Sequence, residues 1–273
     1  MIPFKPNQLQ QKLLHPNPFA KPSLAYLASF LRHLAFGLWT VWAVLALSVH
    51  RPFGSATYPI ILALPIIYLY TFRRSATTQA LLLSAILSIT TFWLYAQKPS
   101  NDRPWQDEVK AQIQFRQIGD QVTVKNVRNF EWISKTDYVP RWEVRRYDLS
   151  QIKSLDLIVS IWDNDNIAHT LLSFGFDDGQ QIAVSFEIRK EIGESFSSIG
   201  GFFRQYEMTI IAADEKDIIY TRSNVRDERV YLYRLSLPRS QIRKLFLAYL
   251  YAAETLAAHP SWYNTLLDNC TTA

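Results

Sequence analysis

Residues 167–188 read IAHTLLSFGFDDGQQIAVSFEI, and this stretch predicts a β-hairpin. Its two halves, 167–176 and 182–188, are rich in apolar residues of the kind that form strands. Between them, residues 177–179 (DDG) are of the types that tight hairpin turns prefer. The pattern therefore predicts two antiparallel strands joined by a short turn, and a sheet built around them.

The same hairpin brings polar side chains together on one face. With the turn centred near Asp178, His169 lies opposite Glu187, and their Cβ atoms are roughly 5 Å apart. A carboxylate there can orient an imidazole and stabilise its cation, as the third member of a catalytic triad does. A register shifted by two residues offers Ser185 on the same face instead. A solvated His–Glu pair on an open sheet face fits the sequence equally well.

Further β-type runs lie on both sides of the hairpin. They cover residues 112–117, 122–127, 142–147, 155–162, 206–212 and 230–235. One helix is predicted from Pro238 to about Ala258, because apolar residues recur there every three or four positions. Pro238 suits the first turn of this helix, and Pro260 follows its end. The order of elements predicts an α+β domain, in which a late helix packs on an antiparallel sheet.

The first 97 residues differ in composition from the rest of the chain. They hold seven Lys and Arg residues and no Asp or Glu, so the net charge of +5 divides into +7 here and −2 in residues 98–273. The pI of 9.2 is therefore no sign of nucleic-acid binding, and no nucleic-acid partner is expected. We expect a membrane anchor at 1–97, a polar linker at 98–104 and a soluble domain at 105–273.

Three apolar stretches, 33–49, 58–72 and 76–96, are candidates for transmembrane helices. A helix needs about 20 residues to cross ~30 Å of hydrocarbon. The second stretch is short and contains Pro65, so two to three spans are expected. One span followed by buried core helices of a soluble protein is the alternative.

The positions of Lys and Arg near the span ends predict the orientation. With three spans and a cytoplasmic N-terminus, six of these residues face the cytoplasm and three face outward. The inner set is Lys5, Lys12, Lys21, Arg32, Arg73 and Arg74, and the outer set is Arg51, Lys98 and Arg103. We therefore expect an inner-membrane protein with a cytoplasmic N-terminus and a periplasmic soluble domain.

The soluble domain lacks the common nucleotide-binding, serine-hydrolase and metalloprotease motifs, and no cofactor or metal ion is expected. Cys270 is the single cysteine of the chain, so thiol chemistry would depend on it. Its base would be His169 or His259. The latter stands at the end of the predicted helix, where the helix dipole favours a cation. The polar residues around Cys270 favour a helix start, where a thiol ionises more readily.

Six strings of the soluble domain, taken in order, resemble one known family. They are NVRNFEW (126–132), RRYDL (145–149), AHTLLSFGFDDG (168–179), SFEIRKEIGE (185–194), RQYEM (204–208) and WYNTLLDNCTT (262–272). The family is the Lnb-type N-terminal periplasmic domain, which includes bacterial lipoprotein N-acyltransferases. The resemblance covers about residues 104–272. It implies a circularly permuted papain-like thiol-enzyme fold, in which the histidine precedes the cysteine.

The resemblance also implies roles for individual residues. Cys270 of the NCTT string would be the nucleophile, His169 of AHT the base, and Glu187 of SFEIR the residue that orients it. Three further matched residues are assigned to substrate binding: Arg189, Tyr206 and Asn264. Members of the family usually continue past NCTT, whereas only three residues follow Cys270 here, so a C-terminally truncated domain is one expectation.

The implied activity is acyl transfer by a cysteine nucleophile. A fatty acyl chain would pass from a membrane lipid to the N-terminal cysteine amine of a diacyl lipoprotein, so the expected partners are that lipid, that lipoprotein and the membrane. Two alternatives stay open: a papain-like thiol peptidase or amidase of the cell envelope, and a catalytically inactive envelope binding module. The sequence leaves the donor lipid and the oligomeric state undecided.

Overall fold

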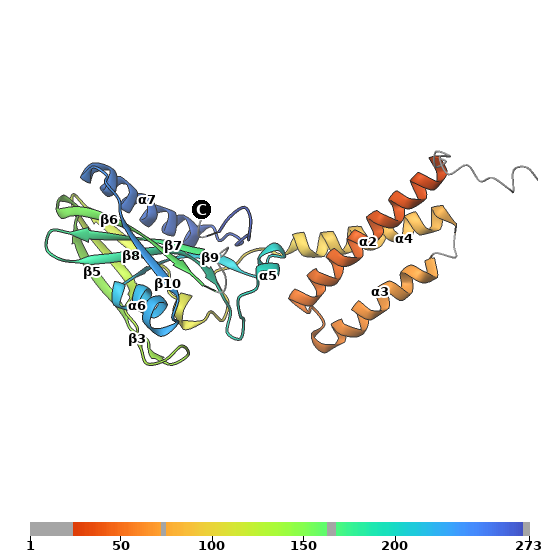
Figure 1. Ribbon diagram of the computed structural model, residues 1–273, viewed down its shortest axis with the longest axis horizontal. Helices are drawn as coiled ribbons and strands as arrows, with labels where there is room; N and C mark the ends of the chain where they lie inside the picture. Colours follow the sequence, from red (N-terminus) through yellow and green to blue (C-terminus); the bar gives the residue numbers. More distant parts are fainter. Residues whose placement is uncertain (1–23, 72–74, 163–167, 270–273) are drawn as a thin grey trace, which may run out of the picture. The chain divides into compact units, whose positions relative to one another are not determined.

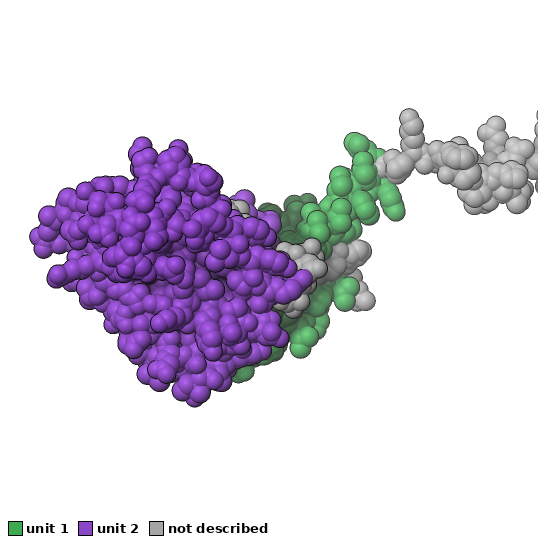
Figure 2. Space-filling view, turned by 60° about the vertical axis from the view of Figure 1, so that its left-hand side comes forward, with its two compact units in different colours: residues 1–90 green, residues 91–273 purple. Residues whose placement is uncertain are grey.

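The computed structural model describes residues 24–71, 75–162 and 168–269 (Figure 1). The chain forms two compact units, residues 1–90 and 91–273 (Figure 2). The predicted linker, 98–104, belongs to the second unit and packs against it. Asn101 Nδ2, for example, donates to the carbonyl oxygen of Ala257 at 2.7 Å.

The first unit is helical. Its helices are α2 (Leu24–His50), α3 (Thr57–Thr71) and α4 (Ala76–Ala96), and the last turns of α4 continue into the second unit. Among the described residues, two segments are long and apolar enough to cross a membrane by length and composition: Tyr26–His50 and Thr77–Ala96. Helix α3 has 15 residues, about 22 Å at 1.5 Å per residue, which is shorter than the hydrocarbon layer.

The second unit is built on one large sheet, which has eight strands in the part of the chain that the structure describes. These are β1 (Gln114–Ile118), β2 (Gln121–Arg128), β5 (Trp142–Asp148), β6 (Ile152–Ile161), β7 (Ala168–Phe176), β8 (Gln181–Arg189), β9 (Glu207–Ala213) and β10 (Arg229–Arg234). Their order is β1-β2-β9-β8-β7-β6-β10, and β5 also pairs with β2. The eight predicted strands are thus confirmed, with ends shifted by a few residues.

The pairing is antiparallel with one exception. Strands β2 and β9 run parallel, and their recorded pair is Arg128 with Ala213. The prediction of a purely antiparallel sheet is corrected to this extent. The sequence pattern also missed a separate two-stranded sheet of β3 (Glu131–Trp132) and β4 (Tyr138–Val139), because two-residue strands carry no detectable alternation.

The central hairpin has the predicted register. Strands β7 and β8 pair from Leu172 with Val184 to Gly175 with Gln181, as a turn centred near Asp178 requires. Gly179 has φ +88°, a conformation that glycine adopts without the steric cost paid by other residues. The turn between β7 and β8 therefore needs a glycine at position 179.

Helices cover both faces of the sheet (Figure 1). Helix α7 (Arg239–Ala258) is the predicted late helix, and its buried Phe246 and Leu250 pack against Phe174 and Phe176 of β7. The opposite face carries α6 (Glu215–Tyr220), whose Ile218 packs in a second apolar cluster with sheet residues. Helix α7 is the one helix that the sequence pattern predicts in this unit; α6 and α5 (Ser198–Phe202) are each shorter than two turns and carry no helical pattern of their own.

Candidate active site

His169 lies on β7 with both of its predicted partners beside it. Its Nε2 is 2.7 Å from Ser185 Oγ and 3.2 Å from Glu187 Oε1. Ser185 Oγ in turn donates to the same oxygen of Glu187 at 2.8 Å. The sequence left Glu187 and Ser185 as alternative partners of the histidine. The structure brings both of them to His169, because residues two positions apart on β8 point to the same face of the sheet.

These contacts assign the protons. A serine hydroxyl has one proton, and Ser185 gives it to Glu187, so Ser185 Oγ accepts from His169. Nε2 of His169 therefore carries the hydrogen in the neutral ring. The lone pair that acts as a base is then on Nδ1, which is the nitrogen turned away from Ser185 and Glu187. The arrangement suits a general base whose tautomer is fixed by its neighbours.

Glu187 is kept ionised by its contacts with Arg222 and His169. Arg222 Nη2 donates to Glu187 Oε1 at 2.8 Å. Burial alone would raise the pKa of Glu187, but the charges of His169 and Arg222, with a smaller effect of Arg128, hold the pKa well below its usual range. Glu187 is thus a carboxylate at neutral pH and can stabilise an imidazolium on His169.

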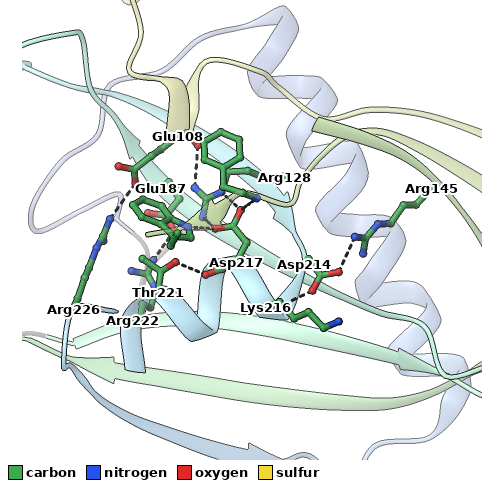
Figure 3. A network of polar contacts seen from close by, with 12 residues as sticks. Glu108, Arg128, Arg145, Glu187, Asp214, Lys216, Asp217, Thr221, Arg222 and Arg226 are labelled. Carbon is green, nitrogen blue, oxygen red and sulfur yellow. Dashed lines mark hydrogen bonds and ion pairs between the residues drawn. The ribbon is translucent and has the colours of Figure 1, made fainter. Parts of the chain in front are cut away.

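A buried carboxylate, Asp217, lies in the same polar network as Glu187 and Arg222 (Figure 3). Asp217 is fully buried and pairs with Arg128 through two hydrogen bonds of 2.8 and 3.0 Å. It also accepts from the backbone N–H of Phe130 at 2.9 Å and from Trp132 Nε1 at 2.8 Å. Four donors on one carboxylate tie α6 to β2 and to the segment after it. Asp217 therefore fixes the helix that leads into Arg222.

The local sequence explains how Arg222 reaches the site. The Asp214 side chain accepts from the Lys216 N–H at 2.8 Å and begins α6. The chain then continues as a π-helical turn, Thr221–Val225, which carries Arg222 toward β8. π-Helical turns are rare and occur often at functional sites. Asp217 and Arg222 were not predicted as site residues, although Asp214 as a helix cap before an acidic first turn is a sequence signal for a helix here.

The site opens into a cavity of about 570 Å³. His169, Glu187 and Arg222 lie in its wall. Part of the lining is aromatic, because Trp162 and Phe196 stack edge to face with ring centroids 4.9 Å apart. The cavity thus places the polar group of His169, Glu187 and Arg222 beside an aromatic surface.

The predicted nucleophile, Cys270, lies outside the described residues. Its neighbour Asn269 is described and lines the cavity that contains His169. The other candidate base, His259, is exposed at the end of α7 and is absent from the residues lining that cavity. Of the two histidines, His169 is therefore the one at the candidate site.

The three residues assigned to substrate binding do not line the cavity among the described residues. Arg189 is buried, and its guanidinium donates to Val109 O, Asn101 Oδ1 and Lys110 O. Burial lowers the pKa of Arg189 to about 10, so the side chain remains a cation at neutral pH.

The other two residues are also engaged within the domain. Tyr206 is buried and donates to Ser195 O at 2.6 Å. Asn264 Oδ1 accepts from two backbone N–H groups of its own turn. Their contact with substrate stays a prediction.

The comparison with family models agrees with the strings quoted above. Residues 138–273 match the model of the Lnb N-terminal periplasmic domain. This part of the chain belongs to that family. The Lnb match contains the hairpin with His169 and Glu187, the π-helical turn and α7, whereas β1 and β2 lie before it.

Searches of curated proteins and of solved structures found no match. A periplasmic Lnb domain and two long apolar helices are consistent with a membrane-anchored protein.

Proposed function

We propose that this protein is a membrane-anchored thiol acyltransferase. It moves a fatty acyl chain from a membrane lipid to the N-terminal cysteine amine of a diacyl lipoprotein. Cys270 is the nucleophile, His169 the base, and Ser185 and Glu187 hold the base. The observation that carries the proposal is His169 Nε2 held at 2.7 Å by Ser185 and at 3.2 Å by Glu187, in the wall of a partly aromatic cavity.

The reaction has two steps. In the first, His169 takes the thiol proton, the sulfur of Cys270 bonds to the ester carbonyl carbon, and the ester C–O bond breaks. The leaving alkoxide takes the proton from His169, which gives a thioester and a lyso-lipid. In the second, the lipoprotein amine attacks the thioester, the C–N bond forms, and the C–S bond breaks. His169 carries the amine proton to the departing thiolate and so restores the enzyme.

The charges around His169 support both steps. The ring becomes a cation twice in each cycle, and ionised Glu187 stabilises that cation at close range. Arg222 prevents Glu187 from taking up the proton itself. This division of roles is the one found in histidine-based triads, here with Ser185 placed between the acid and the base.

The fold and the location form part of the same proposal. The histidine lies on a sheet strand and precedes the cysteine in the chain, which is the order that a permuted papain-like enzyme has. The N-terminus is cytoplasmic, the anchor crosses the inner membrane, and the domain faces the periplasm. A periplasmic reporter enzyme fused after Ser100 tests this orientation. Activity of a cytoplasmic reporter alone at that position would overturn it.

Trapping the acyl-enzyme tests the chemistry. The full-length protein is reconstituted in vesicles whose phospholipids carry one defined acyl chain, and its intact mass is measured before and after hydroxylamine treatment. A mass gain of that one acyl group, removed by hydroxylamine and absent from Cys270→Ala, is the expected result. A wild-type protein without the added mass, together with cleavage of an envelope peptide, would instead favour a thiol peptidase.

A further inference from the structure

We infer that one end of the domain rests on the surface of the lipid bilayer. This docking face is defined by five exposed apolar side chains: Ile192, Ile199, Phe202, Leu266 and Leu267. The inference rests on the membrane anchoring proposed above, and it names the surface through which the lipid reaches the site.

The side chains of the docking face are unusually exposed for their type. Leu266 and Leu267 are 67% and 80% exposed, and Ile192 is 72% exposed. Ile199 and Phe202 of α5 are 48% and 46% exposed. Single exposed apolar residues are common on protein surfaces, but a group at one end of a domain marks a surface that binds an apolar partner.

Hydrogen bonds hold two of these segments, α5 and the C-terminal turn, together. Thr265 Oγ1 donates to Ser198 O at 2.8 Å, which joins the C-terminal turn to α5. Asn264 Oδ1 accepts from the backbone N–H groups of Leu266 and Leu267 at 3.0 Å each, so the turn that carries both leucines has a fixed shape. A hydrogen-bonded turn therefore holds the two exposed leucines in place.

The docking face is connected to the end of the candidate transmembrane helix. Tyr95 is in the last turn of α4, and Arg204, two residues after α5, places its guanidinium 4.2 Å from the centre of the Tyr95 ring. The backbone N–H of Ile192 donates to Pro104 O at 2.7 Å, which ties the face to the segment that follows the helix. Tyrosine at a helix end is typical of a membrane–water boundary.

This connection identifies the partner as a bilayer. If α4 crosses the membrane, its end at Ala96 lies near the headgroups, and the contacts of Arg204 and Ile192 keep the docking face at that level. Arg204, two residues after Phe202, supplies a cation next to α5 in the chain, and the carboxylates of Glu191 and Glu207 are both paired with Arg103. Apolar side chains together with basic residues are the composition of interfacial surfaces.

The docking face also adjoins the candidate active site. Ser198 of α5 and Thr265 of the C-terminal turn line the cavity that contains His169, as do Phe196 and Tyr263. The segments that rest on the bilayer are thus the segments that form one wall of the cavity. This wall is therefore the side from which we expect a lipid tail to enter the cavity.

Depth-dependent quenching tests the inference in the full-length protein. Leu267→Cys and Phe202→Cys are made on a Cys270→Ala background, labelled with an environment-sensitive fluorophore, and reconstituted in vesicles of phosphatidylethanolamine and phosphatidylglycerol. A fraction of the lipids carries a spin label on the acyl chain. Two controls are labelled in the same way: Ile118→Cys, an apolar site on β1 whose exposure lies between those of Leu267 and Phe202, and Asp102→Cys, an exposed site close to the anchor in sequence.

Labels at Leu267 and Phe202 should be quenched at least about twofold more strongly than labels at the two controls. Equal quenching at Leu267 and Ile118 would overturn the inference, and so would equal quenching at Leu267 and Asp102, since that shows nearness to the anchor alone. Adding Leu267→Glu to the Phe202-labelled protein should reduce the quenching, whereas Ile118→Glu should not. The measurement needs no catalysis, so a quenched face on a protein without transferase activity would retain the docking face and reject the proposed function.

Discussion

Arg222 donates a hydrogen bond of 2.8 Å to Oε1 of Glu187. The same oxygen lies 3.2 Å from the imidazole of His169, so a guanidinium and an imidazole share one carboxylate oxygen. Arg222 is only 8% exposed, and the pair is shielded from the solvent that weakens surface ion pairs. The ionisation of Glu187, and through it the protonation of His169, therefore depends on Arg222 in the π-helical turn.

Replacing Arg222 by Met should destabilise the domain by about 3 kcal/mol at neutral pH, because Glu187 would be left with its charge buried. The pKa of Glu187 lies well below its usual range, so its contribution to stability is present above the unfolded-state value and is lost as pH falls through the folded-state value. The difference in the free energy of unfolding between the Met variant and the wild type should therefore shrink progressively as pH falls below about 4.5. Chemical denaturation at neutral pH and at a series of acidic pH values measures this.

Arg222→Lys is the matched variant, because it keeps the charge and loses the fork of donors. It should retain more stability and a faster reaction of Cys270 with a small electrophile than Arg222→Met does. Equal loss of labelling in the two variants would contradict a charge-based role for Arg222.

Asp217→Asn should lower the stability of the domain more than the control variant Asp107→Asn does. It leaves the buried Arg128 without its anion, which typically costs about 3–5 kcal/mol. The control is Asp107→Asn, which breaks an exposed ion pair with Lys110 at 2.7 Å and should change stability by about 0.2–1 kcal/mol. Thermal unfolding followed by circular dichroism compares them. Similar losses in both variants would show that the Asp217 network does not stabilise the fold.

Glu207 should make stability fall as pH rises. Burial raises the pKa of Glu207 to about 7, although the Ser100 N–H and Arg103 partly offset it. Since the folded-state pKa is the higher one, the stabilisation is fully present below the unfolded-state pKa and is lost as pH rises through about 7. The stability that Glu207 contributes should fall by on the order of 3 kcal/mol between pH 4 and pH 8.

Glu207→Gln removes this titration, so its stability should vary less with pH across the same range. Glu254→Gln, at an exposed position of α7, should behave as the wild type does. The same pH dependence of the melting temperature in the wild type and in Glu207→Gln would contradict the assignment.

The two histidines of the domain should behave differently. His169→Ala removes the proton acceptor and should slow the labelling of Cys270 at neutral pH by roughly 10²-fold or more. His259→Ala, at an exposed helix end, should leave the rate unchanged. The rate of labelling by a small electrophile in the folded protein gives the comparison. The reverse order of the two variants would show that His259 is the base.

The sequence predicted the hairpin well because its two determinants are local. The DDG turn sets the register, and the alternation along 182–188 sets which side chains share a face, so His169, Ser185 and Glu187 were found together. The sheet strands followed for the same reason, since each is long enough to show an apolar pattern.

The rest of the site was missed for physical reasons that apply to short elements. Helix α6 has six residues, too few for a helical period to be recognised, and its π-helical continuation has no sequence signature of its own. Asp217 and Arg128 are 89 positions apart in the sequence, and the residues around each of them give no indication that they pair. Arg189 was assigned to substrate because its string matched the family, whereas its contacts depend on a fold that brings Val109 and Lys110 against β8.

The most direct measurement is the intact mass of a diacyl lipoprotein expressed together with this protein in a host that lacks N-acylation. The wild-type protein should add the mass of one acyl chain to the N-terminal amine. Cys270→Ala and His169→Ala should abolish the addition while both proteins remain folded in the membrane, and Glu187→Gln should reduce it less than His169→Ala does. A lipoprotein whose mass is unchanged by well-expressed, folded wild-type protein would contradict the proposed acyl transfer.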